Sequence, residues 1–408
     1  MMINDNTHKA FAIPSYIRLF SRLLKERGHT AYLVGGCVRD MLLGETPKDY
    51  DMTTSALPEE ICAAFEGSYT VIKTGLKHGT VTVLYEKEPV EITTYRVDGT
   101  YSDARRPDSV RFTDRVEEDL SRRDFTVNAM AFDPETGLLD LFGGREDLQN
   151  KVLRCVGRAE TRFTEDALRM LRALRFSARL DFDIDEEAAK AIHFLKERLG
   201  FVSAERIASE MRKCFESAHP ARLEKLLCDY TDVLDVIMPE GAASLTAADC
   251  RDMALIAYGS DTRLAYLAFC TGTSASLGGY WKLSAALSRF IEGFGAAFPE
   301  VSAVTDRIAA RRFAHRFGFP VSEAAAAAYR DITGIAVPFS LTGTVKSEGD
   351  CVSLDALAVN GKDLKALGLN GPAVGEALAF LLESVMADAV MNDRGALIAY
   401  MNKHITSM

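Results

Sequence analysis

The β-strand signals of this chain are confined to about its first 155 residues. Within that segment, β-branched and apolar runs at 31–34, 79–86 and 90–96 accompany a helical stretch at 58–65. Beyond residue 155 the apolar residues recur with helical period and only short breaks interrupt them. The pattern predicts an α+β domain of about 150 residues, with a hairpin at 79–96, followed by a long helical body.

The length of the chain bounds the number of domains. Its 408 residues exceed what one hydrophobic core usually holds, so several domains are expected. The 48% of hydrophobic and 26% of charged residues are ordinary for a globular protein. No apolar run approaches the roughly 18–20 residues that cross a membrane, and the polar first residues are unlike a secretory signal. We predict a cytoplasmic protein with no membrane partner.

The eight cysteines are scattered along the chain. None forms a CxxC pair or a zinc-ligand spacing with histidine. The sequence therefore predicts free, buried thiols rather than a disulfide framework or a zinc site.

Arginine is distributed unevenly in this acidic chain. The net charge of −10 argues against indiscriminate binding of nucleic acid. Residues 151–180 nevertheless carry eight Lys or Arg against three acids, and residues 105–123 carry six Arg. This concentration of positive charge indicates a focused site for an anion.

Two aspartates with one residue between them lie in the segment 48–54, which the sequence pattern predicts to be a strand. On a strand, Asp49 and Asp51 project from one face roughly 6–7 Å apart, while Tyr50 and Met52 face the core. Two carboxylates on one face suit a hard cation such as Mg²⁺. A solvated edge strand is the alternative. The stretch also fits the DxDxT pattern of phosphatases, but no buried apolar strand precedes it.

A glycine pair, Gly35 and Gly36, lies between the first predicted strand and a short predicted helix. Without side chains, the backbone N–H groups there can approach a phosphate, and Arg39 can reach the same anion. A tight turn that needs positive φ is the alternative reading.

The order of these motifs resembles one known family. GGCVRDMLLGETPKDYD is followed by EEDLSRRDFTVNAMA, LLDLFGGREDLQNKVLR, EDALRMLRALRF and SAERIASEM. Together they resemble the polymerase-β-like nucleotidyltransferase superfamily, and within it the class II branch of bacterial tRNA CCA-adding enzymes and poly(A) polymerases.

The resemblance implies an α+β fold: a polymerase-β-like nucleotidyltransferase head with a mixed β-sheet and helices, followed by an all-helical neck, body and tail. The implied divisions are a catalytic head at 1–150, a neck with the nucleobase-recognition helix at 151–215, a body at 216–300 and a tRNA-binding tail at 301–408.

The resemblance also implies roles for single residues. Asp49 and Asp51 would bind Mg²⁺, and Glu91 would act as general base or as a third metal ligand. Further residues would contact the phosphates or ribose of the nucleotide, with Asn128 supporting them: Gly36, Arg39 and Arg123.

The EDALR segment is implied to read the nucleobase. Asp166 and Arg169 are three apart on a predicted helix that Thr164 would cap, and they offer acceptors and donors respectively. Cytosine and adenine each present an amino donor beside a ring acceptor, which matches this pair. Uracil and guanine present the reverse and would leave groups unpaired. Arg172 and Arg175, further along the helix, are predicted to reach phosphate or base.

The predicted function is template-independent addition of C, C and A to tRNA 3′ ends from CTP and ATP. An A-adding enzyme or a poly(A) polymerase is the alternative with the same chemistry, and an inactive RNA-binding protein is the alternative of another class. The loop at 96–109 disfavours an enzyme that adds only CC, because the family associates such a loop with addition of A. The oligomeric state, monomer or homodimer, stays open.

One arginine group in the helical half has two readings. Residues of the segment 307–316 place Arg307, Arg311, Arg312 and Arg316 near one helix face. They form either a phosphate-contacting stripe or a solvated helix surface.

Overall fold

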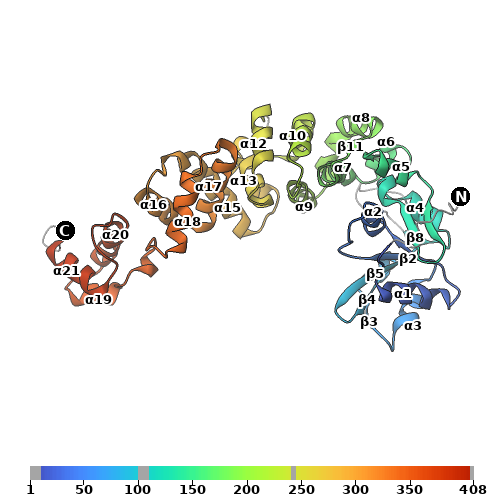
Figure 1. Ribbon diagram of the computed structural model, residues 1–408, viewed down its shortest axis with the longest axis horizontal. Coiled ribbons are helices and arrows are strands. Elements are labelled where there is room, and N and C mark those ends of the chain that lie inside the picture. The colour runs from blue at the N-terminus through green and yellow to red at the C-terminus, as the bar shows by residue number, and fades with distance from the viewer. Residues whose placement is uncertain (1–10, 100–109, 240–244, 405–408) are drawn as a thin grey trace. The chain divides into compact units, whose positions relative to one another are not determined.

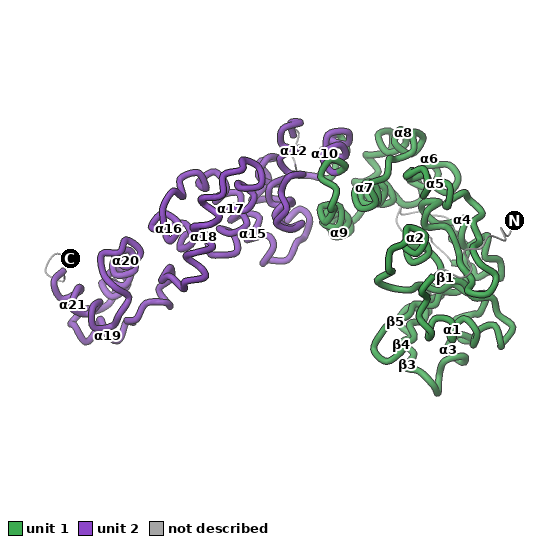
Figure 2. Tube along the Cα trace, viewed as in Figure 1, with its two compact units in different colours: residues 1–222, 232–237 green, residues 223–231, 238–408 purple. Residues whose placement is uncertain are grey.

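The computed structural model describes residues 11–99, 110–239 and 245–404. The chain forms two compact units, which Figure 2 colours separately. Unit 1 comprises residues 1–222 and 232–237, and unit 2 comprises residues 223–231 and 238–408. The predicted loop at 96–109 lies mostly outside the described residues.

Unit 1 is built on a seven-stranded mixed sheet with the strand order β3-β4-β5-β2-β1-β8-β9. Its strands are β1 (Ala31–Val34), β2 (Asp51–Thr54), β3 (Thr70–Ile72), β4 (Thr80–Tyr85), β5 (Glu88–Thr94), β8 (Met130–Asp133) and β9 (Gly137–Asp140). Strands β2 and β5 pair in parallel, whereas the other neighbours are antiparallel. The predicted hairpin is confirmed as β4 and β5, which join at Glu86 with a positive φ of 58°.

Helices α1 (Ser15–Lys25) and α3 (Pro58–Phe65) pack near each other against this sheet (Figure 1). In α1, Ile17, Phe20 and Leu24 are fully buried and recur at helical spacing, so one face of the helix enters the core. The Phe20 ring meets the Phe65 ring edge-on at 4.8 Å between centroids. This packing supports the sheet whose inner strands β2 and β5 carry Asp51 and Glu91.

Short elements complete the head of unit 1. They are α2 (Gly36–Leu42), α4 (Val116–Ser121), α5 (Gly144–Gln149), and a separate two-stranded ribbon of β6 (Arg96–Asp98) and β7 (Val110–Phe112). The remainder of unit 1 is helical: α6 (Ala159–Glu165), α7 (Leu168–Leu180), α8 (Glu186–Leu195), α9 (Ala204–Phe215), and parts of α10 (Pro220–Asp229) and α11 (Thr231–Ile237). The predicted mixed head and helical continuation are thus confirmed.

Two local predictions for this helical part are wrong. A short parallel pair, β10 (Val152–Leu153) with β11 (Asp183–Ile184), lies where mainly helices were expected. The helix expected to start at Thr164 is instead two helices, since Asp166 is extended at φ −138° and ψ 104°. Asp166 Oδ1 accepts a hydrogen bond at 3.1 Å from the backbone N–H of Leu168, the first residue of α7, while Ala167 is at the N-cap position. Thr164 lies in the last turn of α6.

Unit 2 is helical throughout its described residues. Its helices are α12 (Ala247–Leu255), α13 (Ser260–Cys270), α14 (Leu277–Tyr280), α15 (Ala285–Ala297), α16 (Arg307–Phe317), α17 (Phe319–Thr333), α18 (Val337–Ser347), α19 (Gly361–Ala366), α20 (Pro372–Met386) and α21 (Arg394–His404). The alanine run 324–328 of α17 is fully buried, because small side chains let α15 and α18 approach closely. Across the described ranges of both units, no helix is long and apolar enough to span a membrane.

Candidate active site

The glycine pair sits where a strand passes into a helix. β1 ends at Val34 and α2 begins at Gly36, with Gly35 between them at φ 78° and ψ −133°. A Cβ on Gly35 would lie 3.3 Å from Arg123 Nη1, and one on Gly36 would lie 3.6 Å from Arg39 Nη2. Glycine is needed at position 35 because of its backbone conformation and the close approach of the Arg123 guanidinium, whereas a Cβ at position 36 would meet Arg39 at an ordinary contact distance.

The two aspartates lie at the start of β2, but not both on it. Strand β2 begins at Asp51, and Asp49 is in the preceding bend, so the predicted strand over 48–54 is wrong at its start. The cause is the end of β1: its pairing with β2 stops at Leu33 opposite Met52, and the chain then turns at Gly35. Tyr50 and Met52 are buried, as predicted.

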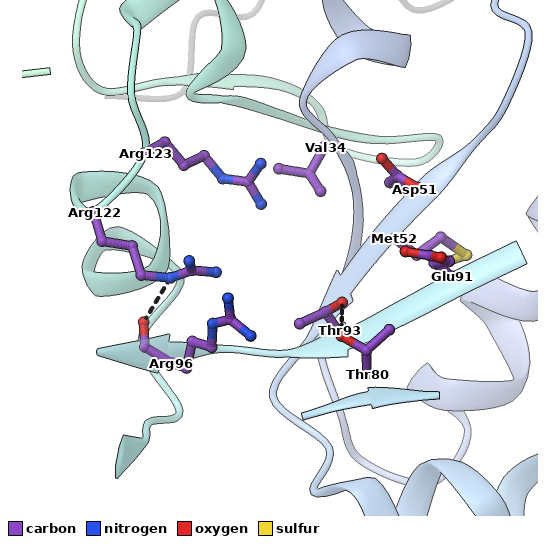
Figure 3. Close-up of a pocket in the computed structure, with 9 residues that line it drawn as sticks. All are labelled: Val34, Asp51, Met52, Thr80, Glu91, Thr93, Arg96, Arg122 and Arg123. Carbon is purple, nitrogen blue, oxygen red and sulfur yellow. Dashed lines mark hydrogen bonds between the residues drawn. The ribbon is translucent and has the colours of Figure 1, made fainter. Parts of the chain in front are cut away.

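Glu91 lies beside Asp51 in the sheet. The two residues are register partners on the parallel strands β2 and β5, and both side chains are on the exposed face, where Figure 3 shows them together. Asp51 keeps an exposed surface, but the protein atoms around its carboxylate displace part of the water there. This desolvation raises the pKa of Asp51 to about 6, aided by the negative charges of Asp49 and Glu91. Arg123 offsets part of that rise.

Two adjoining hollows meet at Asp51 and Arg123. The first, drawn in Figure 3, is lined by Glu91, Thr80, Thr93, Arg96 and Arg122 besides these two. The second contains the shared pair and further residues predicted for the site, namely Gly36, Arg39, Asp49, Arg172 and Arg175. Asn128 also lines it. The structure therefore gathers most of the predicted site residues around one carboxylate.

The arginines of the hollows are held in place by buried acids. Arg39, 2% exposed, donates from Nε and Nη2 to Asp40 Oδ1 at 2.8 and 2.6 Å, and from Nη1 to Asn128 Oδ1 at 2.6 Å. Arg123 Nη2 donates to Asp119 Oδ2 at 3.2 Å. Burial alone would raise the pKa of Asp119, but the charges of Arg122 and Arg123 outweigh it and hold that pKa below its usual value.

Helix α7 supplies the far wall of the second hollow. Arg172 Nη2 lies 2.6 Å from Asp124 Oδ2, and Arg175 Nε lies 3.1 Å from Glu210 Oε2. The Phe176 ring contacts the guanidinium carbons of three arginines, at 5.4 Å for Arg39, 5.3 Å for Arg172 and 4.3 Å for Arg175. These contacts orient positive charge toward the hollow.

Sequence reasoning did not assign the residues that anchor these arginines: Asp40, Asp119, Asp124, Phe176 and Glu210. A signal for the acids was available, because a buried arginine requires a nearby carboxylate and each acid stands within a recognised motif.

Asp166 and Arg169, the pair predicted to read the base, are hydrogen-bonded to other protein groups. Asp166 Oδ2 accepts from Arg206 Nη2 at 2.9 Å. Arg169 Nη1 donates to Glu165 Oε2 at 2.6 Å, and its Nη2 donates to the Arg122 carbonyl at 3.1 Å. Neither Asp166 nor Arg169 lines either of the two hollows. Their role in base recognition stays a prediction.

The arginines of α16 are paired with acids of unit 2. Arg307 and Arg311 both contact Asp350, Arg312 contacts Glu383, and Arg316 contacts Glu300. These pairs favour the reading of a charged helix surface over that of a phosphate-contacting stripe, since each guanidinium already faces a carboxylate.

The carboxylates at Asp51 fit a divalent cation. Mutual repulsion of Asp49, Asp51 and Glu91 is relieved when a cation lies among them. In the described ranges, no group of three or more His, Cys, Asp or Glu is arranged to hold an ion unaided. Mg²⁺ at nucleotide sites is typically held by one or two carboxylates, with substrate phosphates and water completing the shell. The donor set suits an ion that binds with a phosphate substrate. All eight cysteines are free, as predicted, but Cys228 and Cys270 are only partly buried.

A mixed sheet that carries these carboxylates beside a glycine turn and an arginine cluster, continued by helices, defines a nucleotidyltransferase-type head. Residues 31–154 match the family model described as Poly A polymerase head domain. Residues 181–245 match the model described as probable RNA and SrmB- binding site of polymerase A.

The structure is similar to that of the CCA-adding enzyme of Bacillus stearothermophilus in complex with CTP. The TM-score is 0.80 and the identity 31%, over 96% of this chain and 97% of that one. The Thermotoga maritima CCA-adding enzyme complexed with tRNA shares the fold, with a TM-score of 0.68 and 21% identity over 96% of each chain. The chain therefore belongs to the family of class II CCA-adding enzymes and poly(A) polymerases.

Curated relatives match over about half of this chain. The CCA-adding enzyme of Oceanobacillus iheyensis is 46% identical over 206 residues, which are 50% of this chain and 51% of the relative. That of Lactobacillus delbrueckii subsp. bulgaricus is 50% identical over 190 residues, 47% of each chain. The matched part thus spans about half the length of these relatives. Nucleotidyltransferases of this family generally use a divalent metal.

Proposed function

We propose that this chain is a CCA-adding enzyme, which transfers C, C and A from CTP and ATP to the 3′ end of tRNA and releases pyrophosphate. The observation that supports the proposal most is that Asp49 and Asp51 line the same hollow as Gly36 and a cluster of arginines. Likeness to the CTP-bound Bacillus stearothermophilus enzyme over 96% of the chain supports it.

The second hollow is proposed to hold the triphosphate. Arg39, Arg123, Arg172 and Arg175 line it, and each is oriented by an acid or an amide, so that little reorganisation is needed when an anion binds. The guanidinium groups of Arg39 and Arg123 place donors beside the glycine turn, and a Cβ at Gly35 would press against that of Arg123.

Asp49 and Asp51 are proposed to hold Mg²⁺ together with the substrate phosphates. When bound, that ion would neutralise triphosphate charge and lower the pKa of the attacking 3′-hydroxyl. Glu91 lines only the first hollow, so the 3′ end of the tRNA is proposed to enter there. In that position Glu91 takes the proton from the hydroxyl or completes the metal shell.

Base selection is proposed to rest on Asp166 and Arg169. Their carboxylate and guanidinium complement the amino donor and ring acceptor of cytosine and adenine. The four predicted divisions, head at 1–150, neck at 151–215, body at 216–300 and tail at 301–408, are kept as part of this proposal, with the helical divisions holding tRNA. A cytoplasmic location, which the sequence predicts, accords with a tRNA substrate.

Three tRNA primers test the proposal. They end at the discriminator base, at C and at CC, and each is incubated with CTP alone, ATP alone or both, with products resolved by length. A CCA-adding enzyme extends the first two primers with CTP and the third with one A. Extension of only the CC primer would indicate an A-adding enzyme, and long A tracts a poly(A) polymerase. No extension of any primer, with tRNA still bound, would indicate an inactive binder.

A further inference from the structure

The first hollow has a negative end and a positive end. Asp51 and Glu91 form the negative end, side by side on strands β2 and β5. Thr93 follows Glu91 by two residues on β5, so it lies roughly 6–7 Å further along the same face of the sheet. Figure 3 shows the guanidinium groups of Arg96 and Arg122 beyond Thr93, at the end away from the two carboxylates. The hollow can therefore hold a metal-bound hydroxyl at one end and an anion at the other.

The guanidinium of Arg96 is only partly used by the protein. Nη1 donates to the His78 carbonyl, whereas Nε is buried and has no hydrogen-bond partner among the residues that the structure describes. Asp98 Oδ1 is 3.7 Å from Nε, beyond hydrogen-bond distance. The backbone of Arg96 is fixed, since its N donates to Asp119 Oδ1 at 3.3 Å and its carbonyl accepts from Arg122 Nε at 3.1 Å. A buried donor that is held in place without an acceptor is costly, which indicates an acceptor supplied by a ligand.

Positive charge exceeds negative charge at this end of the hollow. Three guanidinium groups share two carboxylates there: those of Arg96, Arg122 and Arg123 with those of Asp98 and Asp119. Burial lowers the pKa of Arg96, and the charges of the other two arginines lower it further, although the two carboxylates act in the opposite direction. A bound anion would offset the excess positive charge.

Two threonine hydroxyls lie beside these arginines. Thr80 and Thr93 are register partners on β4 and β5, and a hydrogen bond of 3.0 Å joins their Oγ1 atoms. Both residues line the hollow. One hydrogen bond between two hydroxyls uses only one of their two protons, so the other can be donated into the hollow. Arginine and threonine are common ligands of the phosphate oxygens of nucleic acids.

We propose that Arg96, together with the hydroxyl pair of Thr80 and Thr93, binds the phosphodiester that precedes the last nucleotide of the tRNA primer. The inference rests on the proposed function, because that function takes the 3′ end of the tRNA into this hollow. A phosphate held at Arg96 sets how far the primer enters, so that its terminal 3′-hydroxyl stops at Asp51 and Glu91. The phosphates of the incoming nucleotide are the other source of the same chemistry, and the test separates the two.

The test compares two synthetic tRNA primers that end at C. They differ only in the linkage before the last nucleotide, which is either a normal phosphodiester or a neutral methylphosphonate. Wild type, Arg96→Met and Arg96→Lys extend both primers with CTP, and kcat/KM is measured for each primer. Arg111→Met is the control, because Arg111 lies on β7 of the same ribbon, has a side chain 72% exposed and lines neither hollow. Thermal unfolding checks that the variants fold.

In wild type the neutral linkage is expected to lower kcat/KM about 10-fold, the worth of roughly one charge-assisted hydrogen bond. In Arg96→Met the two primers are expected to differ by less than about 2-fold, because the group that senses the charge is gone. Arg96→Lys should keep part of the penalty and Arg111→Met all of it. No penalty in wild type, or a full penalty in Arg96→Met, would overturn the proposal. A raised KM for CTP with the full penalty kept would assign Arg96 to the nucleotide phosphates instead.

A second variant keeps the test decisive if the Arg96 variants do not fold. Thr93→Val has nearly the same volume and removes one hydroxyl of the pair, so it should reduce the penalty of the neutral linkage, and an unchanged penalty would count against the site. Equilibrium binding of the two primers gives the same comparison without transfer. If wild type prefers the charged primer but adds no nucleotide, the phosphate site stands and the proposed function fails. If it extends both primers equally well, the proposed function stands and the phosphate site fails.

Discussion

Asp51 and Glu91 are register partners on the parallel strands β2 and β5, and both carboxylates face the same hollow. Parallel pairing at this one place in a largely antiparallel sheet is what puts them side by side. Asp49 adds a third negative charge from the bend before β2. The protein therefore stores repulsion at this point, and a cation relieves it.

That repulsion predicts a pH dependence of stability for the metal-free protein. The folded-state pKa of Asp51 is about 6, above its ordinary value of 3.8, so the folded state binds the proton more tightly than the unfolded state. The contribution of Asp51 to stability is therefore full below about pH 4 and is lost as pH rises through 6. Urea unfolding of wild type and Asp51→Asn between pH 4 and 7 measures it. The stability gained by Asp51→Asn should grow with pH over this range, and a constant difference would contradict the raised pKa.

Gly35 is predicted to be required for both folding and activity. Gly35→Ala strains a backbone at φ 78° and brings Cβ to 3.3 Å from Arg123 Nη1, which should cost about 1–2 kcal/mol of stability and displace Arg123. Gly44→Ala is the matched control, since Gly44 also has φ 78° but nothing within 4 Å of the added Cβ. Thermal unfolding and CTP incorporation are measured on both. Gly44→Ala should lose stability alone, and equal activity in the two variants would count against a role for this contact.

Asp119 is predicted to hold Arg122 and Arg123 in place. It is fully buried, and Arg122 and Arg123 both donate to it. Asp119→Asn leaves two partly buried guanidinium groups with less compensation, so a loss of about 3 kcal/mol is expected by chemical denaturation. Glu117→Gln, at an exposed pair with Arg115, should change stability by less than about 0.5 kcal/mol. Similar losses in the two variants would show that burial of Asp119 does not matter.

Glu91 is predicted to affect the chemical step rather than nucleotide binding. It lines the first hollow and not the second, so Glu91→Gln should lower kcat about 100-fold and leave the KM for CTP nearly unchanged. Steady-state kinetics over a range of CTP concentrations measures both constants. A large rise in KM with kcat maintained would instead make Glu91 part of the nucleotide site.

Much of the site was predictable from sequence because its residues cluster in short motifs. Gly36, Arg39, Arg123, Arg172 and Arg175 were named from those motifs, and the structure brings them to one hollow. Their long-range partners were not named, since Asp124 and Glu210 meet α7 only through the tertiary fold.

The errors in local structure share one cause. Strand period placed Asp49 on β2, and helical period carried one helix through Asp166. In both places the element begins later than its period suggests: β2 begins at Asp51, and α7 begins at Leu168, whose backbone N–H donates to Asp166 Oδ1. Periodicity indicates the type of an element more reliably than its end.

The account depends most directly on Asp49 and Asp51 holding a divalent ion with the triphosphate. The decisive measurement is single-turnover incorporation of CMP into a tRNA that ends at the discriminator base, by wild type, Asp49→Ala and Asp51→Ala, with tRNA binding measured in parallel and Mn²⁺ binding followed by electron paramagnetic resonance. We predict that both variants lose incorporation by roughly 100-fold or more and lose Mn²⁺ binding in the presence of CTP, while tRNA affinity is kept. Retained incorporation in both variants would contradict the account.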